Sequence, residues 1–442
     1  MYIKLSDHFN FNRLLRFALP SIIMMVFTSL YSIVDGFFVS NFVGKTPFAA
    51  VNLIMPVLMI LASVGFMFGA GGSALVSKTL GEGCREKAQR LFSLFIYCTA
   101  ISGIVIAAVT FLFIRPLAVL LGAEGAVLDA CVIYGRILLI SLPLYMLQFE
   151  FQSFFITAEK PQLGLAITLI CGITNMILDA LFVAVFSWGL AGAAVATAIS
   201  QILGGIIPVF YFSRPNSSQL RLTKAKLDGS ALLKACANGS SELMSNISTS
   251  VVSILYNVQL MKYAGENGVA AYGVLMYVNM IFLGVFIGYS TGTAPIVSYH
   301  YGAKNHGELK SLLRKSLVII GVLAVSMFLL AELSAKTLAG IFVSYDKELM
   351  AMTVRAFRIY SFSFLFSSVA VYGSSFFTAL NDGLTSALIS FLRTLLFQVG
   401  AVLILPIFLK IDGIWLSVVA AEMAAAALTL LFITAKRRKY CY

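Results

Sequence analysis

Two aspartates lie inside long apolar stretches of the sequence, where a carboxylate is costly to keep. Asp35 falls in the segment TSLYSIVDGFFVSN, within an apolar run from residue 14 to about residue 43, and Asp179 falls in CGITNMILDALF. Tyr31 and Asn175 each precede one of these acids by four residues, so each pair shares a helix face. An acid inside a bilayer costs roughly 2.5–3.5 kcal/mol. We therefore predict one intramembrane polar site; packing of a carboxylate against a Ser or Tyr is the alternative.

The predicted site contains only oxygen donors. Asp35, Asp179 and Thr197 sit at one depth, roughly 8–11 Å below the outer membrane boundary at 1.5 Å per helical residue. Two carboxylates, the Asn175 amide and the Thr197 hydroxyl suit either Na⁺ or a proton held by a carboxylate pair. A Ca²⁺ or transition-metal site is disfavoured because no His, Cys or ligand-dense loop accompanies them. We therefore predict that Asp35, Asn175, Asp179 and Thr197 bind a coupling cation, H⁺ or Na⁺.

The composition is that of an integral membrane protein. Of 442 residues, 60% are hydrophobic and only 11% are charged, and the mean hydropathy is +0.94. Soluble domains carry about 25% charged residues. Separate apolar runs along the whole chain exclude a single anchor, and the first run lacks the cleavage site of a signal peptide. The 6 cysteines are scattered without a CxxC motif or His partners. Cys98 and Cys171 lie within apolar runs and are expected to fill apolar space.

The apolar runs predict an all-α membrane protein with twelve transmembrane helices in two six-helix bundles. A transmembrane helix needs about 20 apolar residues. We place helices near 14–40, 51–77, 91–114, 130–157, 162–186, 190–212, 236–262, 270–298, 315–335, 352–379, 384–409 and 413–435. We expect an N-terminal bundle at 1–212, a polar cytoplasmic linker at 213–235 and a C-terminal bundle at 236–442.

The two halves repeat when the sequence is shifted by 221 residues. The shift places Gly44 on Gly265, and Gly71 on Gly292, and it needs no gap. Six helices per half make the repeat parallel, with a pseudo-two-fold axis along the membrane normal. The polar residues do not recur: Asp35, Asn175, Asp179 and Thr197 fall on Tyr256, Leu396, Gly400 and Val418. The predicted cation site therefore belongs to the first half alone.

The placement of basic residues predicts the topology. With the N-terminus inside, about two thirds of the Lys and Arg side chains fall in cytoplasmic segments, as the positive-inside rule requires. Both termini are then cytoplasmic, and the protein spans the cell (plasma or inner) membrane many times. The net charge of +12 is thus a topology signal, and no nucleic-acid partner is expected.

Further polar residues lie within predicted helices. Tyr31 and the group Gln148, Glu150 and Gln152 are candidates for substrate binding or gating, with pairing of Glu150 to Lys160 as the structural alternative. In the second half, Glu242, Glu422 and Arg393 are interpreted as structural charges. A buried acid with a base at a compatible depth is more often an ion pair than a site.

The chain resembles the multidrug and toxic compound extrusion (MATE) family over all twelve predicted helices. Helix 1 carries Pro20, Tyr31 and Asp35, helix 5 carries the Asn175-x3-Asp179 motif, and helix 6 carries Thr197. Glycine-rich turns lead into 78–83 and recur at 288–302. The resemblance implies that Asp35, Asn175, Asp179 and Thr197 are the family's first-half cation site and that Pro20 is a hinge in helix 1.

The chain departs from some relatives in two places. The helix predicted at 352–379 contains no acid, and Glu242 lies too early in its helix to match relatives that couple through the second half. Where many relatives have Arg-Ala-Glu/Asp-Gly after helix 4, this chain has Thr157-Ala158-Glu159-Lys160. Neither a second-half coupling mechanism nor a role for that loop is therefore transferred.

These observations predict a secondary active exporter. It would exchange inward H⁺ or Na⁺ for an outward-moving amphipathic, cationic organic compound while two bundles rock. We expect a monomer that contacts membrane lipid and needs no cofactor beyond the coupling ion. A lipid-linked oligosaccharide flippase is the alternative, but extra helices and a basic cavity are not evident. A membrane enzyme is disfavoured because no paired His, nucleophile elbow or metal motif is present.

Overall fold

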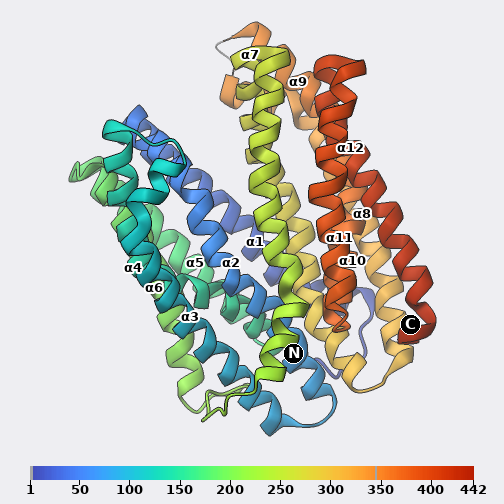
Figure 1. Ribbon diagram of the computed structural model, residues 1–442. Coiled ribbons are helices and arrows are strands. Elements are labelled where there is room, and N and C mark those ends of the chain that lie inside the picture. Colours follow the sequence, from blue (N-terminus) through green and yellow to red (C-terminus); the bar gives the residue numbers. More distant parts are fainter. Residues whose placement is uncertain (1–2, 344–345) are drawn as a thin grey trace. The chain divides into compact units, whose positions relative to one another are not determined.

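The computed structural model describes residues 3–343 and 346–442, and this part of the chain is helical with no β-strand (Figure 1). The helices are α1 (Phe11–Phe38), α2 (Lys45–Gly81), α3 (Arg85–Leu120), α4 (Gly125–Thr157), α5 (Pro161–Asp179), α6 (Gly189–Ser213), α7 (Gly229–Gly302), α8 (His306–Val343), α9 (Lys347–Ser361), α10 (Ser363–Ala379), α11 (Gly383–Phe391) and α12 (Gln398–Tyr440). Three π-helical segments interrupt them: η1 (Val39–Val43), η2 (Ala180–Val185) and η3 (Leu392–Phe397).

The described residues contain 9 helices long and apolar enough to span a bilayer, or 10 if α9 and α10, bent by 47°, form one span. Two of these helices contain an internal break. α7 has 74 residues and is non-helical at Gly265 (φ 61°, ψ −152°), and α12 is non-helical at Lys410 (φ 52°, ψ −127°). The predicted helices 236–262 and 270–298 lie on either side of Gly265, and 384–409 and 413–435 lie on either side of Lys410.

Left-handed backbone conformations mark several of the turns and breaks. Gly83 has φ +80° and Lys304 has φ +55°, and the two positions are 221 residues apart. The same spacing separates Gly44 (φ 108°) from Gly265 (φ 61°). It also separates Gly189 (φ 61°) from Lys410 (φ 52°). The chain thus reverses or breaks at matching positions of its two halves.

The chain divides into two compact units whose limits cut through α1 and α7. The first unit contains the described residues before Asp7 together with Phe27–Gly239, and the second contains Asp7–Val26 and Ser240–Tyr442. The sequence placed these limits at 212 and 236 instead, with residues 1 and 2 lying outside the described part. The first half of α1 therefore belongs with the C-terminal helices, and the first turns of α7 belong with the N-terminal helices.

Close helix contacts at glycines explain this division. In the second unit, a Cβ on Gly288 would lie 2.5 Å from the Cα of Ile22, so α7 approaches the first half of α1 backbone to backbone. In the first unit, a Cβ on Gly71 would lie 2.0 Å from the carbonyl oxygen of Ala235, so α2 and the start of α7 are equally close. Small residues allow such approaches in membrane helices. The sequence shows the glycines but not the helices that they face.

The segment predicted as a linker is an ordered part of the first unit. Residues between α6 and α7 lie against α3, where the backbone N–H of Thr223 donates to Ser93 Oγ at 2.8 Å. The amide of Gln89 donates to the carbonyl of Gln219 at 3.0 Å. The loop is also shorter than predicted, because α7 begins at Gly229 rather than near residue 236.

Each unit has its own apolar core. In the first unit α4 packs against α2, α3 and α6, and its core includes the fully buried Tyr134 and Met146. In the second unit α10 packs against α8, α11 and α12. The core of the second unit includes Trp415 and the stacked rings of Tyr256 and Tyr272, 5.3 Å apart. These cores hold the polar groups described next inside apolar surroundings.

Candidate functional site

The first unit places the two predicted acids at the ends of regular helix. Asp179 is the last residue of α5 before η2 and is 0% exposed. Asp35 lies on α1, four residues before η1 begins. The side chains of Asp35 and Asp179 are close enough to interact directly, and Thr197 on α6 also neighbours Asp35. π-helical turns occur frequently at functional sites because they widen the helix locally.

Few hydrogen bonds satisfy this group. The Nδ2 of Asn175 donates to Thr197 Oγ1 at 3.4 Å, which links α5 to α6. Four other oxygen atoms are buried without a hydrogen-bond partner in the described residues. They are Asp35 Oδ1, both carboxylate oxygens of Asp179, and Asn175 Oδ1.

Unpartnered buried acceptors of this kind fit a cation. Buried polar atoms nearly always have partners, so a cluster of orphaned oxygens calls for an explanation. A proton shared between two carboxyl groups, or a Na⁺ ion held by carboxylate, amide and hydroxyl oxygens, would satisfy them. In the described residues no three His, Cys, Asp or Glu side chains come together as a metal cluster. The donor set consists of carboxylate, amide and hydroxyl oxygens, which are the donors that the cation-site prediction names.

Close packing of α1 on α5 positions the acids. A Cβ on Gly172 would lie 2.5 Å from the ring of Phe27 and 2.9 Å from the ring of Tyr31. The glycine thus lets both aromatic rings lie directly on α5. Tyr31 is one turn from Asp35, and Gly172 is two turns from Asp179, so this contact brings the two acid-bearing segments together. Tyr31 accordingly lies between α1 and α5, and its role in substrate binding or gating stays a prediction.

Two tyrosines of α4 were missed by the sequence analysis. Tyr134 is completely buried and its charge environment includes Asp35 and Asp179. Tyr145 is likewise within electrostatic reach of Asp35 and Tyr31. Within the described residues their hydroxyls donate to sulfur, Tyr134 to Met55 at 3.9 Å and Tyr145 to Met59 at 3.6 Å. Nothing in the sequence distinguishes them from other apolar-run tyrosines, because neither has a polar residue at helical spacing that points to the acids.

The predicted gating residues of α4 form a separate buried group. Glu150 is 0% exposed, and neither of its carboxylate oxygens has a hydrogen-bond partner in the described residues. The alternative pairing of Glu150 to Lys160 is therefore not observed. Gln148 lies over Gly204 of α6, where a Cβ would be 2.4 Å from its Cδ, and Gln152 is buried. No described contact joins these three residues to Asp35 or Asp179.

Pro20 lies inside α1 and is buried. It falls in the part of α1 that belongs to the second unit, six residues before that part ends at Val26. A proline removes one helical hydrogen bond and crowds the preceding turn. Its position next to the division between units is compatible with the predicted hinge.

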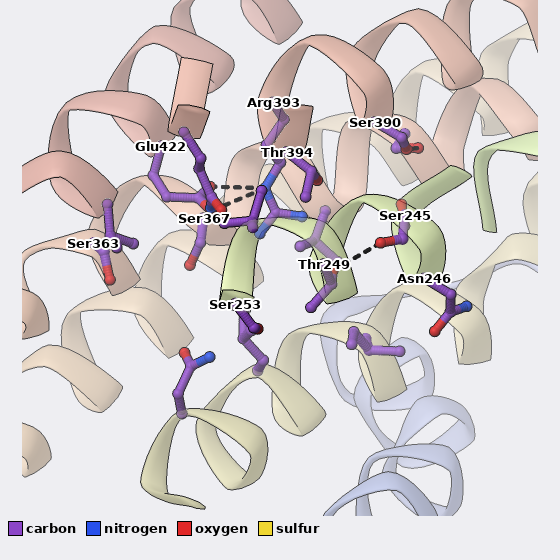
Figure 2. Close-up of a pocket in the computed structure, with 18 of the residues that line it drawn as sticks. Ser245, Asn246, Thr249, Ser253, Ser363, Ser367, Ser390, Arg393, Thr394 and Glu422 are labelled. Atoms are coloured by element: carbon purple, nitrogen blue, oxygen red, sulfur yellow. Dashed lines mark hydrogen bonds and ion pairs between the residues drawn. The ribbon is translucent and has the colours of Figure 1, made fainter. Parts of the chain in front are cut away.

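The second unit holds the three charges that the sequence analysis interpreted as structural. Arg393 in η3 donates through Nε to both oxygens of Glu422 on α12, at 3.0 and 2.9 Å (Figure 2). Glu242 on α7 lines the same cavity but forms no ion pair within the described residues. The sequence left open which glutamate faces Arg393, and the structure shows that it is Glu422.

Comparison with known proteins agrees with this architecture. The MatE family model matches residues 20–181 and 243–403. "Multidrug export protein MepA" of Staphylococcus aureus (strain MSSA476) is 23% identical over 429 residues, which cover 96% of this chain and 93% of the relative. MepA of Staphylococcus haemolyticus (strain JCSC1435) is 23% identical over 435 residues, covering 97% and 94%.

The fold is also that of solved structures. One is described as the outward-facing conformation of a multidrug resistance MATE family transporter of the MOP superfamily. It superposes with a TM-score of 0.93 at 22% identity, covering 98% of this chain and 97% of the other. Since the family model matches well over half of the sequence, the chain belongs to the MatE family of multidrug and toxic compound extrusion transporters.

Proposed function

We propose that this protein is a secondary active exporter that exchanges inward H⁺ or Na⁺ for outward movement of a lipophilic organic cation. The observation that carries the proposal is the set of four unpartnered buried oxygens of Asp35, Asn175 and Asp179 inside the first unit. Intramembrane acids are costly and in transporters mark ion pathways. The relatives named multidrug export proteins add support for the direction and the substrate type.

The coupling step follows from competition for charge. When the carboxylates of Asp35 and Asp179 hold a cation, their negative charge is neutralised and the organic cation loses its attraction. When they release the cation, the charge returns and the organic cation binds. A cation drives the cycle only by binding one conformation of the protein more tightly than the other. Pro20 would serve as the hinge that lets α1 follow this change.

Two bundles of six helices would provide the two conformations. Twelve spans result if α7 is counted as two spans broken at Gly265, the run from α11 to the end of α12 as two spans broken at Lys410, and α9–α10 as one bent span. The left-handed residues spaced by 221 positions support a parallel repeat of six helices. Both termini then lie in the cytoplasm of a cell whose plasma or inner membrane carries the protein.

The aromatic wall beside the acids suits a lipophilic cation. Phe27 and Tyr31 lie 6.0 Å apart by ring centroids and face α5 at Gly172, two turns before Asp179. Ring faces attract cations, and more strongly where water is excluded. Apolar burial and negative charge together would select amphipathic cations over neutral or anionic compounds.

Substitution of Asp35 in proteoliposomes tests the proposal. Wild-type protein should export a cationic dye when a pH gradient or a Na⁺ gradient is imposed, each applied separately. Asp35→Asn should abolish this export while its melting temperature holds or rises, because an unsolvated charge has been removed. Glu124→Gln is the matched control, since Glu124 is an exposed acid at the start of α4. Export at the wild-type rate by Asp35→Asn would refute the assignment.

A further inference from the structure

The second unit encloses a polar cavity apart from the acids of the first unit. Its volume is about 280 Å³, and its walls come from α7 and α9–α12. Figure 2 shows hydroxyl and amide side chains around it, among them Asn246 and Thr249 of α7, Ser367 of α10 and Thr394 of η3. Drug-sized ligands occupy pockets of roughly 300–1,000 Å³. The volume therefore suits a small solute rather than a large amphipathic drug.

Arg393 presents unused hydrogen-bond donors in this cavity. Its Nε donates to both oxygens of Glu422, and the two Nη atoms make no hydrogen bond with the described residues. The guanidinium has five N–H groups and is always protonated in proteins. Figure 2 shows the rest of the group directed away from Glu422. A planar pair of Nη atoms matches the two oxygens of a carboxylate.

Glu242 supplies an opposite charge on the wall formed by α7. It lines the cavity, and its backbone carbonyl accepts from Asn246 Nδ2 at 2.9 Å. Its carboxylate has no hydrogen bond or ion pair in the described residues, so it does not occupy the Nη donors of Arg393. The hydroxyl of Ser367 is a further buried and unpartnered atom on the wall.

We propose that this cavity binds a small zwitterionic solute, with its carboxylate on the Nη atoms of Arg393 and its ammonium group on Glu242. An organic cation alone would leave the Nη donors of Arg393 without an acceptor. An organic anion alone would leave Glu242 uncompensated. A ligand that carries both charges satisfies both groups, and the hydroxyl-rich wall accommodates its polar backbone. The inference that the protein transports this solute rests on the proposed export function. The inference that the cavity binds it does not.

Binding to the full-length protein in detergent tests the inference without any gradient. The probes are α,ω-amino acids of increasing length (glycine, 4-aminobutyrate, 6-aminohexanoate and 8-aminooctanoate), because chain length then measures the separation of the two charges. For each, the matched amine and the matched carboxylate lack one charge. The best-fitting amino acid should raise the melting temperature with concentration, and its affinity should exceed that of either matched compound by about tenfold or more.

Two variants test which side chain binds which charged group of the amino acid. Glu242→Gln should lower the affinity for the amino acid by about tenfold or more. It should leave the affinity for the matched carboxylate unchanged or improved. Arg393→Lys keeps the positive charge beside Glu422 but loses the paired Nη donors. It should therefore lower the affinity for the amino acid and for the matched carboxylate to a similar degree. Glu242 has no ion pair to lose, so Glu242→Gln keeps the test valid if Arg393→Lys does not fold.

Three results would overturn the inference: no member of the series binds, the matched amine or carboxylate binds as tightly as the amino acid, or Glu242→Gln binds the amino acid like the wild type. The proposed function fails separately. Asp35→Asn should retain binding of the amino acid while losing export of the cationic dye. If the wild-type protein does not export the dye, the proposed function is refuted, but the binding inference is unaffected.

Discussion

The side-chain amide of Asn175 donates to the hydroxyl of Thr197 at 3.4 Å and so joins α5 to α6 beside the two acids of the first unit. Because this bond uses the nitrogen of the amide, the oxygen of Asn175 is left as a buried acceptor. The bond therefore determines which end of the amide is available to a cation. At the proposed cation site, Thr197 would contribute its own hydroxyl and would also orient the Asn175 amide.

Thr197→Val should remove that orientation while keeping the side-chain shape. A hydrogen bond of this kind contributes about 0.5–1.5 kcal/mol, so we expect cation affinity to fall about threefold to tenfold and export to persist at a reduced rate. The measurement is the concentration of H⁺ or Na⁺ that gives half-maximal efflux. Thr197→Ser, which keeps the hydroxyl, should be close to wild type. Equal losses in both variants would point to packing instead.

Asp179→Asn should have the same effect as Asp35→Asn, and the double variant should be little worse than either single variant. Residues that form one binding unit are strongly non-additive, because the first loss already removes the function. Gradient-driven efflux of the three variants provides the comparison. If the fold-reduction in efflux of the double variant instead equals the product of the two single reductions, the acids have separate roles. One could then bind the cation and the other contact the substrate.

Glu422→Gln should destabilise the second unit, since it leaves Arg393 without its partner. Breaking a buried ion pair from one side costs about 3–5 kcal/mol, and the side chains of this pair are only 18% and 4% exposed. We expect a lower melting temperature, with partial recovery when Arg393→Gln is added. Glu242→Gln is the matched control and should melt like the wild type. This differs from the expectation based on sequence, which treated both glutamates as structural charges.

Glu242→Gln also distinguishes structure from coupling in the second unit. The variant should retain the cation dependence of dye efflux, because the acids of the first unit are intact. A stable Glu242→Gln protein that has lost this dependence would place a coupling site in the second unit.

Asp382 links the start of α11 to the end of α12 and predicts a pH dependence. Its carboxylate accepts from Lys436 at 2.7 Å and from the hydroxyl of Tyr440 at 2.8 Å. Burial alone would raise the pKa of Asp382, but hydrogen bonds from Lys436, Tyr440 and Thr385 and the charge of Lys436 lower it below the usual value.

The sign of the effect follows from that lowered pKa. A carboxyl that is more acidic in the folded state stabilises the protein above its unfolded pKa of about 3.9, and this stabilisation is lost as pH falls through the folded pKa. Asp382→Asn should therefore lower the free energy of unfolding by about 1–3 kcal/mol near neutral pH. Its melting temperature should approach that of the wild type in strong acid. If the difference in melting temperature between Asp382→Asn and the wild type stays constant with pH, the ionised carboxylate is excluded as the cause.

Helix positions were predictable wherever an apolar run stops at polar residues. The predicted helix 162–186 corresponds to α5 with η2, which together cover 161–185. α7 was predicted too short, because its first turns contain Lys234 and few strongly apolar residues, so hydropathy does not mark them. The π-helical segments were not predicted at all, since one extra residue in a turn leaves no pattern of residue types.

The candidate site was predictable in its members but not in its contacts. Asp35 and Asp179 were identified because a carboxylate inside an apolar run is energetically costly. Helical spacing then added Tyr31 and Asn175. Spacing gives the face of a helix but not the neighbouring helix that it meets. It therefore could not choose between Glu242 and Glu422 as the partner of Arg393. For the same reason it could not show that the first half of α1 packs with the C-terminal helices.

The shared helix α1 has a consequence for how the chain matures during synthesis. Ile22 leaves the ribosome early, yet Gly288, against which it packs, follows about 270 residues later. At a synthesis rate of about 5–20 residues per second, that interval is on the order of 10–60 s. During this time the first half of α1 lacks its contact with Gly288, although the first unit is nearly complete. The first half of α1 therefore packs against α7 only after most of the chain has been synthesised.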